Sequence, residues 1–176
     1  MVYLETDRLL LRNYKKDDLY EFIKMNQDKK VMKFFPNILS EMESIALYNK
    51  ITSHIMENNF GLFACELKSN NKFIGFIGFN NTNMMDAVNY PFVEIGWRLC
   101  SKYHNQGLAT EGALACLNYG FSKLGFTEIF SFTSKLNIPS QKVMEKIGMN
   151  FIKTFDHPRV SNNSPLKSHV LYSIKN

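Results

Sequence analysis

The chain has 176 residues, of which 45% are hydrophobic and 21% charged, with a formal net charge of +5. This length fits one domain spanning residues 1–176, which buries about 70% of its unfolded surface without a metal or disulfide. The first residues, "MVYLETDRLLLR", contain no apolar h-region, and no run of about 18 apolar residues is present, so neither a secreted nor a membrane-spanning protein is expected. The basic residues are scattered among acidic ones, so a nucleic-acid-binding surface is not expected, whereas a small phosphorylated ligand is compatible with the charge.

The first half of the chain predicts one strand, two helices and then three strands. The second helix has the clearest start, because Ser40 and Glu43 form a capping-box pattern before an apolar face of helical period. After it the period of the apolar residues changes to two, which is typical of strands separated by Asn-rich turns. The predicted ranges are a strand at 7–14, helices at 17–27 and 40–59, and strands at 60–67, 73–81 and 92–100.

The second half alternates helices with strands. A helix is predicted at 110–124, a strand at 128–134, and a helix at 138–147 that ends at Gly148, a residue suited to the position after a helix. Two closing strands follow at 149–155 and 169–174. Strands and helices in this order indicate an α+β fold with a central mixed sheet on which the helices pack.

The cysteines and histidines point to no metal or disulfide. The three cysteines, Cys65, Cys100 and Cys116, are an odd number, lie far apart and sit in apolar segments, so we expect free thiols in a cytoplasmic protein. The four histidines are scattered and no C-x-x-C spacing occurs, so no metal is expected.

Residues 103–121, "YHNQGLATEGALACLNYGF", are unusually rich in small side chains where a loop enters a helix. A helix N-terminus with Gly107 and Ala109 beside it would let a phosphate approach the free amides. Small residues such as Gly112 and Ala113 would equally serve close packing of the helix on the sheet. The stretch itself leaves both interpretations open, and it matches neither a Walker loop nor a dinucleotide-binding fingerprint.

Six motifs in order over nearly the whole chain resemble the GNAT superfamily of acetyl-CoA-dependent N-acetyltransferases. The resemblance is closest to the branch of ribosomal-protein N-terminal (RimJ/RimL-like) acetyltransferases. It implies a mostly antiparallel sheet of about seven strands flanked by about four helices. The motifs are "TDRLLLRNY", "VMKFFP", "EIGWRL", "GLATEGA", "SFTSKLNIPSQKVMEKIGM" and "FDHPRVSNNSPLKSHVLY".

The resemblance implies that the loop before the third helix binds the pyrophosphate of coenzyme A. Gly107 and Ala109 match the last two fixed places of the superfamily pattern [QR]-x-x-G-x-[GA], while His104 replaces the first. Backbone amides are expected to make the contacts, so this departure matters little. The amides belong to Gln106, Gly107, Leu108, Ala109 and Thr110.

The strand "FVEIGWRLC" carries the candidate base. Alternation places Glu94 on the face opposite Val93 and Ile95, and an arbitrary Glu there would most often face solvent. In the family this face lies beside the acetyl group, which implies that Glu94 accepts the amine proton or anchors the acceptor amine. By resemblance, a backbone N–H at Leu99 or Cys100 stabilises the thioester oxygen.

The helix "NIPSQKVMEK" departs from the pattern of many GNAT enzymes. Those enzymes have a proton-donating Tyr seven residues after the opening Asn, and here Asn137 is followed by Met144, which cannot donate a proton. Ser140 is the alternative, because a Ser at this place in the ribosomal branch bonds the coenzyme sulfur. Asn137 is expected to cap the helix, and Ser140 to sit in its first turn whether or not it is catalytic.

The acceptor site is less defined. The resemblance places Phe34 and Phe35 in the acceptor pocket, although an aromatic pair is more often core. Asp156, His157 and Arg159 recur in a subset of relatives and would shape either the acceptor site or a turn.

The function that the resemblance implies is transfer of an acetyl group from acetyl-CoA to a primary amine, either a protein N-terminus or a small molecule. The alternative, suggested by Met144, is a catalytically silent acyl-CoA-binding module, and a basic nucleic-acid-binding domain is a weaker third. Acetyl-CoA and an amine acceptor are the expected partners, without nucleic acid or membrane. The oligomeric state stays open, a homodimer included.

Overall fold

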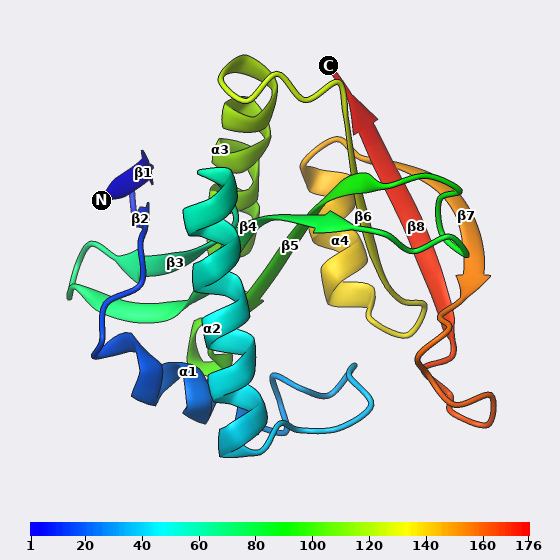
Figure 1. Cartoon of the computed structure of the whole chain (residues 1–176), viewed down its shortest axis with the longest axis horizontal. Helices are drawn as coiled ribbons and strands as arrows, with labels where there is room; N and C mark the ends of the chain where they lie inside the picture. The colour runs from blue at the N-terminus through cyan, green and yellow to red at the C-terminus, as the bar shows by residue number, and fades with distance from the viewer.

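The computed structural model describes residues 1–176 as one open sheet of eight strands with four α-helices (Figure 1). The strand order is β1-β2-β3-β4-β5-β6-β8-β7, and only the β5–β6 pair is parallel. The mostly antiparallel α+β fold is therefore confirmed. The strands are β1 Val2–Glu5, β2 Leu9–Arg12, β3 Leu62–Leu67, β4 Lys72–Thr82, β5 Phe92–Leu99, β6 Glu128–Ser134, β7 Asn150–Asp156 and β8 Ser168–Lys175. The helices are α1 Asp18–Gln27, α2 Glu41–Asn58, α3 Leu108–Ser122 and α4 Ile138–Lys146, with a short 3-10 turn at Ser101–Tyr103.

Local signals in the sequence account for the helix boundaries. The capping box at Ser40 and Glu43 is present, with both reciprocal hydrogen bonds formed. The Asn137 side chain accepts from the amide of Ser140 at the start of α4, and Gly148 takes a φ of +84° just after the end of that helix. Helix α3 begins two residues earlier than predicted, at Leu108. Strand β1 is additional, because four residues are too few to show a period and pairing with β2 holds them.

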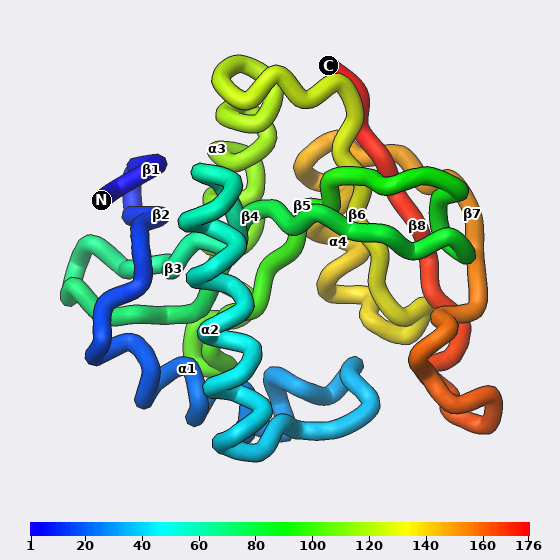
Figure 2. Tube along the Cα trace, in the orientation of Figure 1, coloured from blue at the N-terminus to red at the C-terminus, as the bar shows by residue number.

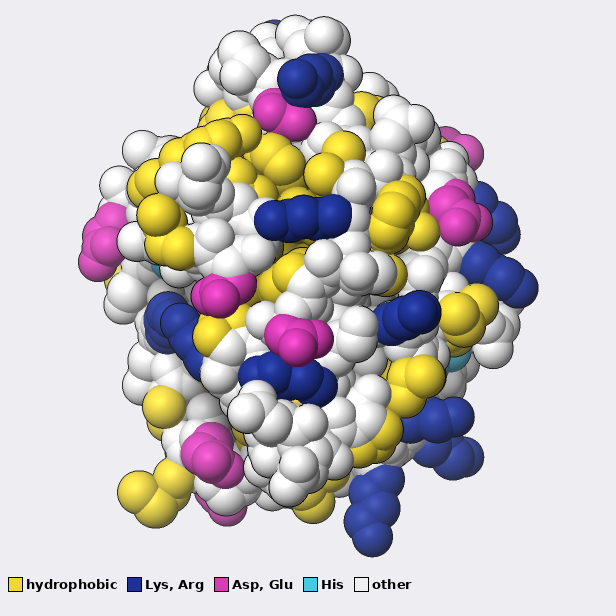
Figure 3. Space-filling model, turned by 90° about the vertical axis from the view of Figure 1, so that its right-hand side faces the viewer, with side chains coloured by type: hydrophobic (Ala, Val, Ile, Leu, Met, Phe, Trp, Pro, Cys, Tyr) yellow, Lys and Arg dark blue, Asp and Glu magenta, His cyan; other side chains and the backbone are white.

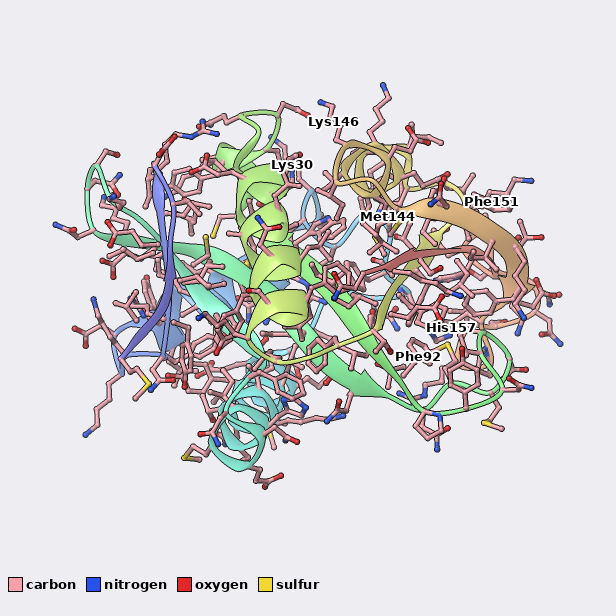
Figure 4. All side chains as sticks on the ribbon, turned by 90° about the horizontal axis from the view of Figure 1, so that it is seen from above. Lys30, Phe92, Met144, Lys146, Phe151 and His157 are labelled. Atoms are coloured by element: carbon pink, nitrogen blue, oxygen red, sulfur yellow. The ribbon has the colours of Figure 1, made fainter.

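The helices cover both faces of the sheet. Helices α1 and α2 lie on one face, and α3 and α4 lie on the other (Figures 1 and 4). The main core of 29 buried residues lies between these layers. Gly112 of α3 is where the helix comes closest to the sheet, since a Cβ there would lie 2.5 Å from Ile77 Cδ1 and 3.3 Å from Leu9 Cδ1.

A second, smaller core lies under the connection between β4 and β5. This connection reaches across the front of β6 and β8 (Figure 2). Its apolar side chains Met84, Ala87 and Val88 pack with Phe130 of β6 and Leu171 of β8. The cluster attaches the β6–β8–β7 half of the sheet to the first half, where β5 and β6 share little pairing.

A buried ion network holds the base of α1 against the sheet. The Arg12 guanidinium donates to Asp18 at 2.6 and 2.9 Å and to Glu66 at 2.6 Å, and all three residues are at most 5% exposed. Lys15 Nζ adds a fourth charge, 2.7 Å from Glu66 Oε2. Two positive and two negative charges therefore balance, which is the condition for burying ions at tolerable cost.

On the face in Figure 3 basic side chains lie over the centre and also along the lower right edge. Those over the centre are interspersed with acidic and apolar side chains, whereas those along the lower right edge have apolar neighbours. No helix combines the length and the apolar character that a bilayer crossing demands.

Candidate functional site

The parallel strands β5 and β6 pair at a single position, Glu94 with Phe130. Beyond it the carbonyl of Ile95 accepts from the hydroxyl of Ser131 at 2.9 Å in place of a ladder bond. The carboxyl ends of β5 and β6 therefore open a gap in the sheet. A crevice at the carboxyl ends of parallel strands is the usual ligand position in sheets with crossover helices.

The strand register decides which amide on β5 faces this gap. The N–H of Cys100 donates to the carbonyl of Ile74 on β4 at 2.8 Å, so Cys100 is occupied within the sheet. Hydrogen-bonding direction alternates along a strand, which turns the N–H of Leu99 toward the β6 side. Of the two amides considered from the sequence, only Leu99 is free to face the gap. The carbonyl of Leu99 accepts a hydrogen bond from His104 Nε2 at 2.8 Å, so the His104 side chain is bonded to the end of β5.

The N-terminus of α3 lies after the carboxyl end of β5. Gly107 is the N-cap, with a φ of +77° and no side chain that could cap the helix. The first intrahelical hydrogen bond runs from the amide of Glu111 to the carbonyl of Gly107, at 3.0 Å. The earlier helical amides of Leu108, Ala109 and Thr110 have no partner within the helix. A Cβ on Gly107 would meet only Arg8 Nη2, at 3.5 Å, so the approach to these amides is open.

The small residues of this stretch therefore divide between the two interpretations that the sequence left open. Gly112 and Ala113 are buried and serve close packing on the sheet. Gly107 instead supplies a left-handed backbone and an open approach to the helix N-terminus, which suits an anion.

Arg8 braces this N-terminus from outside the helix, a role that sequence reasoning missed. Its guanidinium contacts Glu111 Oε2 at 2.6 Å and the carbonyl of Gln106 at 2.9 Å, while Thr6 Oγ1 donates to Glu111 at 2.6 Å. Burial acts to raise the pKa of Glu111, but the hydrogen bonds from Thr6 and Arg8 outweigh it, and the pKa lies below its ordinary value. The signal for this role in the sequence was the motif "TDRLLLR", which contains both Thr6 and Arg8.

Helix α4 begins after the carboxyl end of β6, beside α3. Asn137 Nδ2 donates to Thr133 Oγ1 at 2.9 Å while its oxygen caps the amide of Ser140. The Ser140 side chain is partly exposed in the first turn, and its hydroxyl has no hydrogen bond within the protein. Met144 is 1% exposed and belongs to the main core (Figure 4), so this position serves packing.

Glu94 lies on the α1 and α2 face of β5, opposite Asn80 of β4. Thr82 Oγ1 donates to Glu94 Oε2 at 2.8 Å and accepts from Asn80 Nδ2 at 3.2 Å. Burial raises the pKa of Glu94 to about 7, although the bond from Thr82 acts to lower it. A hollow of about 90 Å³ between α2 and the sheet is lined in part by Asn80, the residue that pairs with Glu94. A carboxyl with this pKa can exchange a proton near neutral pH.

Arg98 stands on the same face, four residues further along β5. Its Nη1 donates to Asn26 Oδ1 at 2.6 Å, and the Phe35 ring lies 4.3 Å from its guanidinium carbon. Phe35 is 38% exposed, whereas Phe34 is partly buried with Lys33 Nζ 5.3 Å from its ring centre. The structure thus brings Phe35 into contact with the Glu94 face and leaves Phe34 with Lys33.

The hairpin of β7 and β8 ends in an aromatic group. The rings of His157 and His169 have centres 4.7 Å apart, and Phe132 lies 6.0 Å from His157. Burial lowers the pKa of both histidines. Asp156 and Arg159 are exposed at the turn and make no side-chain hydrogen bond or ion pair. No three of the protein's histidine, cysteine and acidic side chains gather as metal ligands would.

A wider hollow of about 600 Å³ lies at the amino ends of β5 and β6, lined in part by Thr82, Tyr90 and Phe130. It is remote from the α3 N-terminus, which follows the carboxyl end of β5. Its wall shares Thr82 with the Glu94 site.

Comparison with known proteins places this geometry in one family. A family model described as an acetyltransferase (GNAT) domain matches residues 8–150. The chain is 33% identical over 149 residues to the uncharacterized N-acetyltransferase YnaD of Bacillus subtilis, covering 84% of this chain and 82% of that protein.

Solved structures agree. An acetyltransferase of the GNAT family from Bacillus anthracis superposes with a TM-score of 0.80 at 29% identity, covering 98% of this chain and 97% of that one. RimL, a ribosomal L7/L12 alpha-N-protein acetyltransferase in complex with coenzyme A, superposes with a TM-score of 0.80 at 12% identity. The match covers 99% of this chain and 98% of that one, and at this identity it shows the shared fold alone.

Proposed function

This chain belongs to the GNAT family of acetyltransferases, which transfer the acetyl group of acetyl-CoA, and we propose that its acceptor is a primary amine that attacks the thioester directly. The acceptor class covers small-molecule amines and protein N-termini. The observation that carries the proposal is the gap between β5 and β6, with the open α3 N-terminus on one side and Glu94 on the other.

The amides at the start of α3 suit the pyrophosphate of acetyl-CoA, since a helix N-terminus presents free N–H groups and positive potential. Nothing at Gly107 blocks the approach, and the carboxylate of Glu111 is already neutralised by Arg8. The cradle of this proposal comprises Gln106, Gly107, Leu108, Ala109 and Thr110.

In the proposed reaction the amine nitrogen attacks the thioester carbonyl carbon and the carbon–sulfur bond breaks. Glu94 takes the amine proton, for which a pKa of about 7 is well matched at neutral pH. The N–H of Leu99 donates to the developing oxyanion. The hydroxyl of Ser140, which has no partner in the chain, protonates the departing sulfur and regains its proton from solvent.

The remaining alternative, a catalytically silent module, draws on Met144. Met144 is buried in the core, where its side chain serves packing. Acetyl transfer does not need a Tyr at this position if Ser140 protonates the departing sulfur. Mixing the protein with acetyl-CoA and a panel of primary amines, with release of free thiol as the readout, tests the proposal. Binding of acetyl-CoA without thiol release for any amine would favour the silent module.

A further inference from the structure

Arg98 is a partly buried cation without an anionic partner. Its one side-chain hydrogen bond goes to the neutral amide oxygen of Asn26, at 2.6 Å. The Nε of Arg98 and the Nδ2 of Asn26 are both buried and have no hydrogen-bond partner. Burial lowers the pKa of Arg98 to about 10, so the group still carries its charge at neutral pH. An uncompensated charge at such a place is costly for the fold.

The same sheet shows how this protein treats an arginine that is purely structural. Arg12 is 5% exposed and bonds both Asp18 and Glu66. Arg8, which is half exposed, is still paired with Glu111. Arg98 is absent from every ion pair of the chain, although its surroundings are mostly buried. Arg98 therefore differs from the other two arginines of this comparison in having no carboxylate beside it.

Two aromatic rings lie against the guanidinium of Arg98. Phe35 and Phe76 lie 4.3 and 5.3 Å from the guanidinium carbon of Arg98. Stacked rings stabilise the cation, but they offer no hydrogen-bond acceptor to its N–H groups. Phe35 comes from the connection between α1 and α2 and is 38% exposed, so solvent and small solutes reach this side of the molecule.

Glu94 and Arg98 lie on one face of β5 with no side chain between them. Gly96 separates them and is paired with Gly78 on β4, which leaves a floor of bare backbone. A Cβ on Gly96 would meet only Leu62 Cδ2, at 3.9 Å. Four residues of strand correspond to roughly 13 Å between the two Cα atoms. A ligand with its amine at Glu94 must therefore reach along the strand to meet Arg98.

We propose that Arg98 binds a carboxylate of the acceptor, so that the acetyl acceptor is an amine carrying a carboxylate several bonds away. This inference rests on the proposed function and specifies the substrate class of the same site. A single cation without a counter-charge matches a single negative charge, which favours a carboxylate over a phosphate dianion. The alternation of side chains places Arg98 on the α1 face and the α3 cradle on the other, which separates it from the pyrophosphate.

Two amines of equal chain length test this selectivity: 6-aminohexanoate and hexylamine. The wild-type protein should acetylate 6-aminohexanoate with a kcat/KM about tenfold or more above that for hexylamine. Arg98→Met should lower kcat/KM for 6-aminohexanoate by about 10- to 100-fold, the effect of losing a charged hydrogen bond, and change it less than about threefold for hexylamine. Lys72→Met, which removes a cation at the far hairpin of β3 and β4, is the control, because Lys72 is exposed and makes no ion pair, and it should leave both values unchanged.

Arg98→Lys, which keeps the charge, guards against loss of the fold and should retain part of the preference. Equal losses for both amines in folded variants, or equal use of both amines by the wild type, would overturn the inference. If the wild type binds acetyl-CoA and acetylates no amine, the proposed function fails separately. In that case calorimetric titration with hexanoate decides: binding that Arg98→Met abolishes supports the carboxylate site, and no binding to the wild type refutes it.

Discussion

Replacing Glu94 with Gln tests the proposed base and the energetic cost of burying it in one variant. Glutamine keeps the side-chain length and an oxygen that can accept the 2.8 Å hydrogen bond from Thr82 Oγ1. It cannot take up a proton. The variant therefore removes the titration of this position and retains its geometry.

The magnitude follows from the pKa of Glu94, which burial raises from 4.5 to about 7. Between these values the folded state holds a proton that the unfolded state has lost, so this contribution to stability falls as pH rises. The contribution is complete below 4.5, the ordinary pKa, and is lost as the pH passes through about 7. At about 1.4 kcal/mol for each pKa unit, the ionised Glu94 costs the wild type about 3 kcal/mol at about pH 8.

Two measurements follow on the same pair of proteins. Urea unfolding should give the two proteins similar stability at about pH 4.5 and make Glu94→Gln more stable by about 2–3 kcal/mol at about pH 8. The wild-type kcat should rise with pH and level off above the pKa of about 7. The variant should bind acetyl-CoA with unchanged affinity, lose activity near neutrality and recover part of it at high pH, where the free amine is abundant.

Each measurement can refute its part of the reasoning. A variant whose kcat overlays the wild type at every pH removes Glu94 from the mechanism. A raised acceptor KM with an unchanged kcat would instead make Glu94 an anchor for a cationic amine. A stability difference that is the same at both pH values would show that the pKa of Glu94 is not raised in the folded protein.

Three further variants address the cradle, the leaving group and the fold. Gly107→Glu should abolish coenzyme A binding in calorimetry, because it adds bulk and negative charge at the α3 N-terminus; Gly125→Glu, also at positive φ but in open space, controls for backbone strain and should bind normally. Ser140→Ala should lower kcat by about 10²–10⁴-fold with little change in the acetyl-CoA KM, and a fall below about threefold would make the residue structural. Arg12→Met should cost about 3–5 kcal/mol in urea unfolding, because two buried carboxylates lose their partner; a cost under about 1 kcal/mol would contradict the ion network as described.

Features that depend on neighbouring residues in the chain could be predicted from the sequence. The capping box at Ser40, the cap at Asn137 and the helix stop at Gly148 all arise within a few residues, and each is present. The face of Glu94 also follows from alternation alone. Strand β1 could not be predicted in this way, because its four residues gain their structure from pairing with β2.

Features that depend on distant segments could not be read from the sequence. Whether Gly112 serves a ligand or packing depends on where Ile77 and Leu9 lie. The missing partner of Arg98 is a property of the whole fold, since any of the 16 acidic residues could have supplied a counter-charge. Arg8 is likewise 103 residues away from Glu111 in the chain, and only folding brings them together.

The two sides of the gap between β5 and β6 differ in what recognises the ligand. On the α3 side the proposed contacts are backbone amides, which every residue except proline can supply, so a family position can change to His104 without loss of the cradle. On the α1 side the proposed contacts are side chains: Glu94, Arg98 and Phe35. Substitution there alters charge and shape directly. The donor is therefore expected to be common to the family, and the acceptor to be decided by the side chains of this second face.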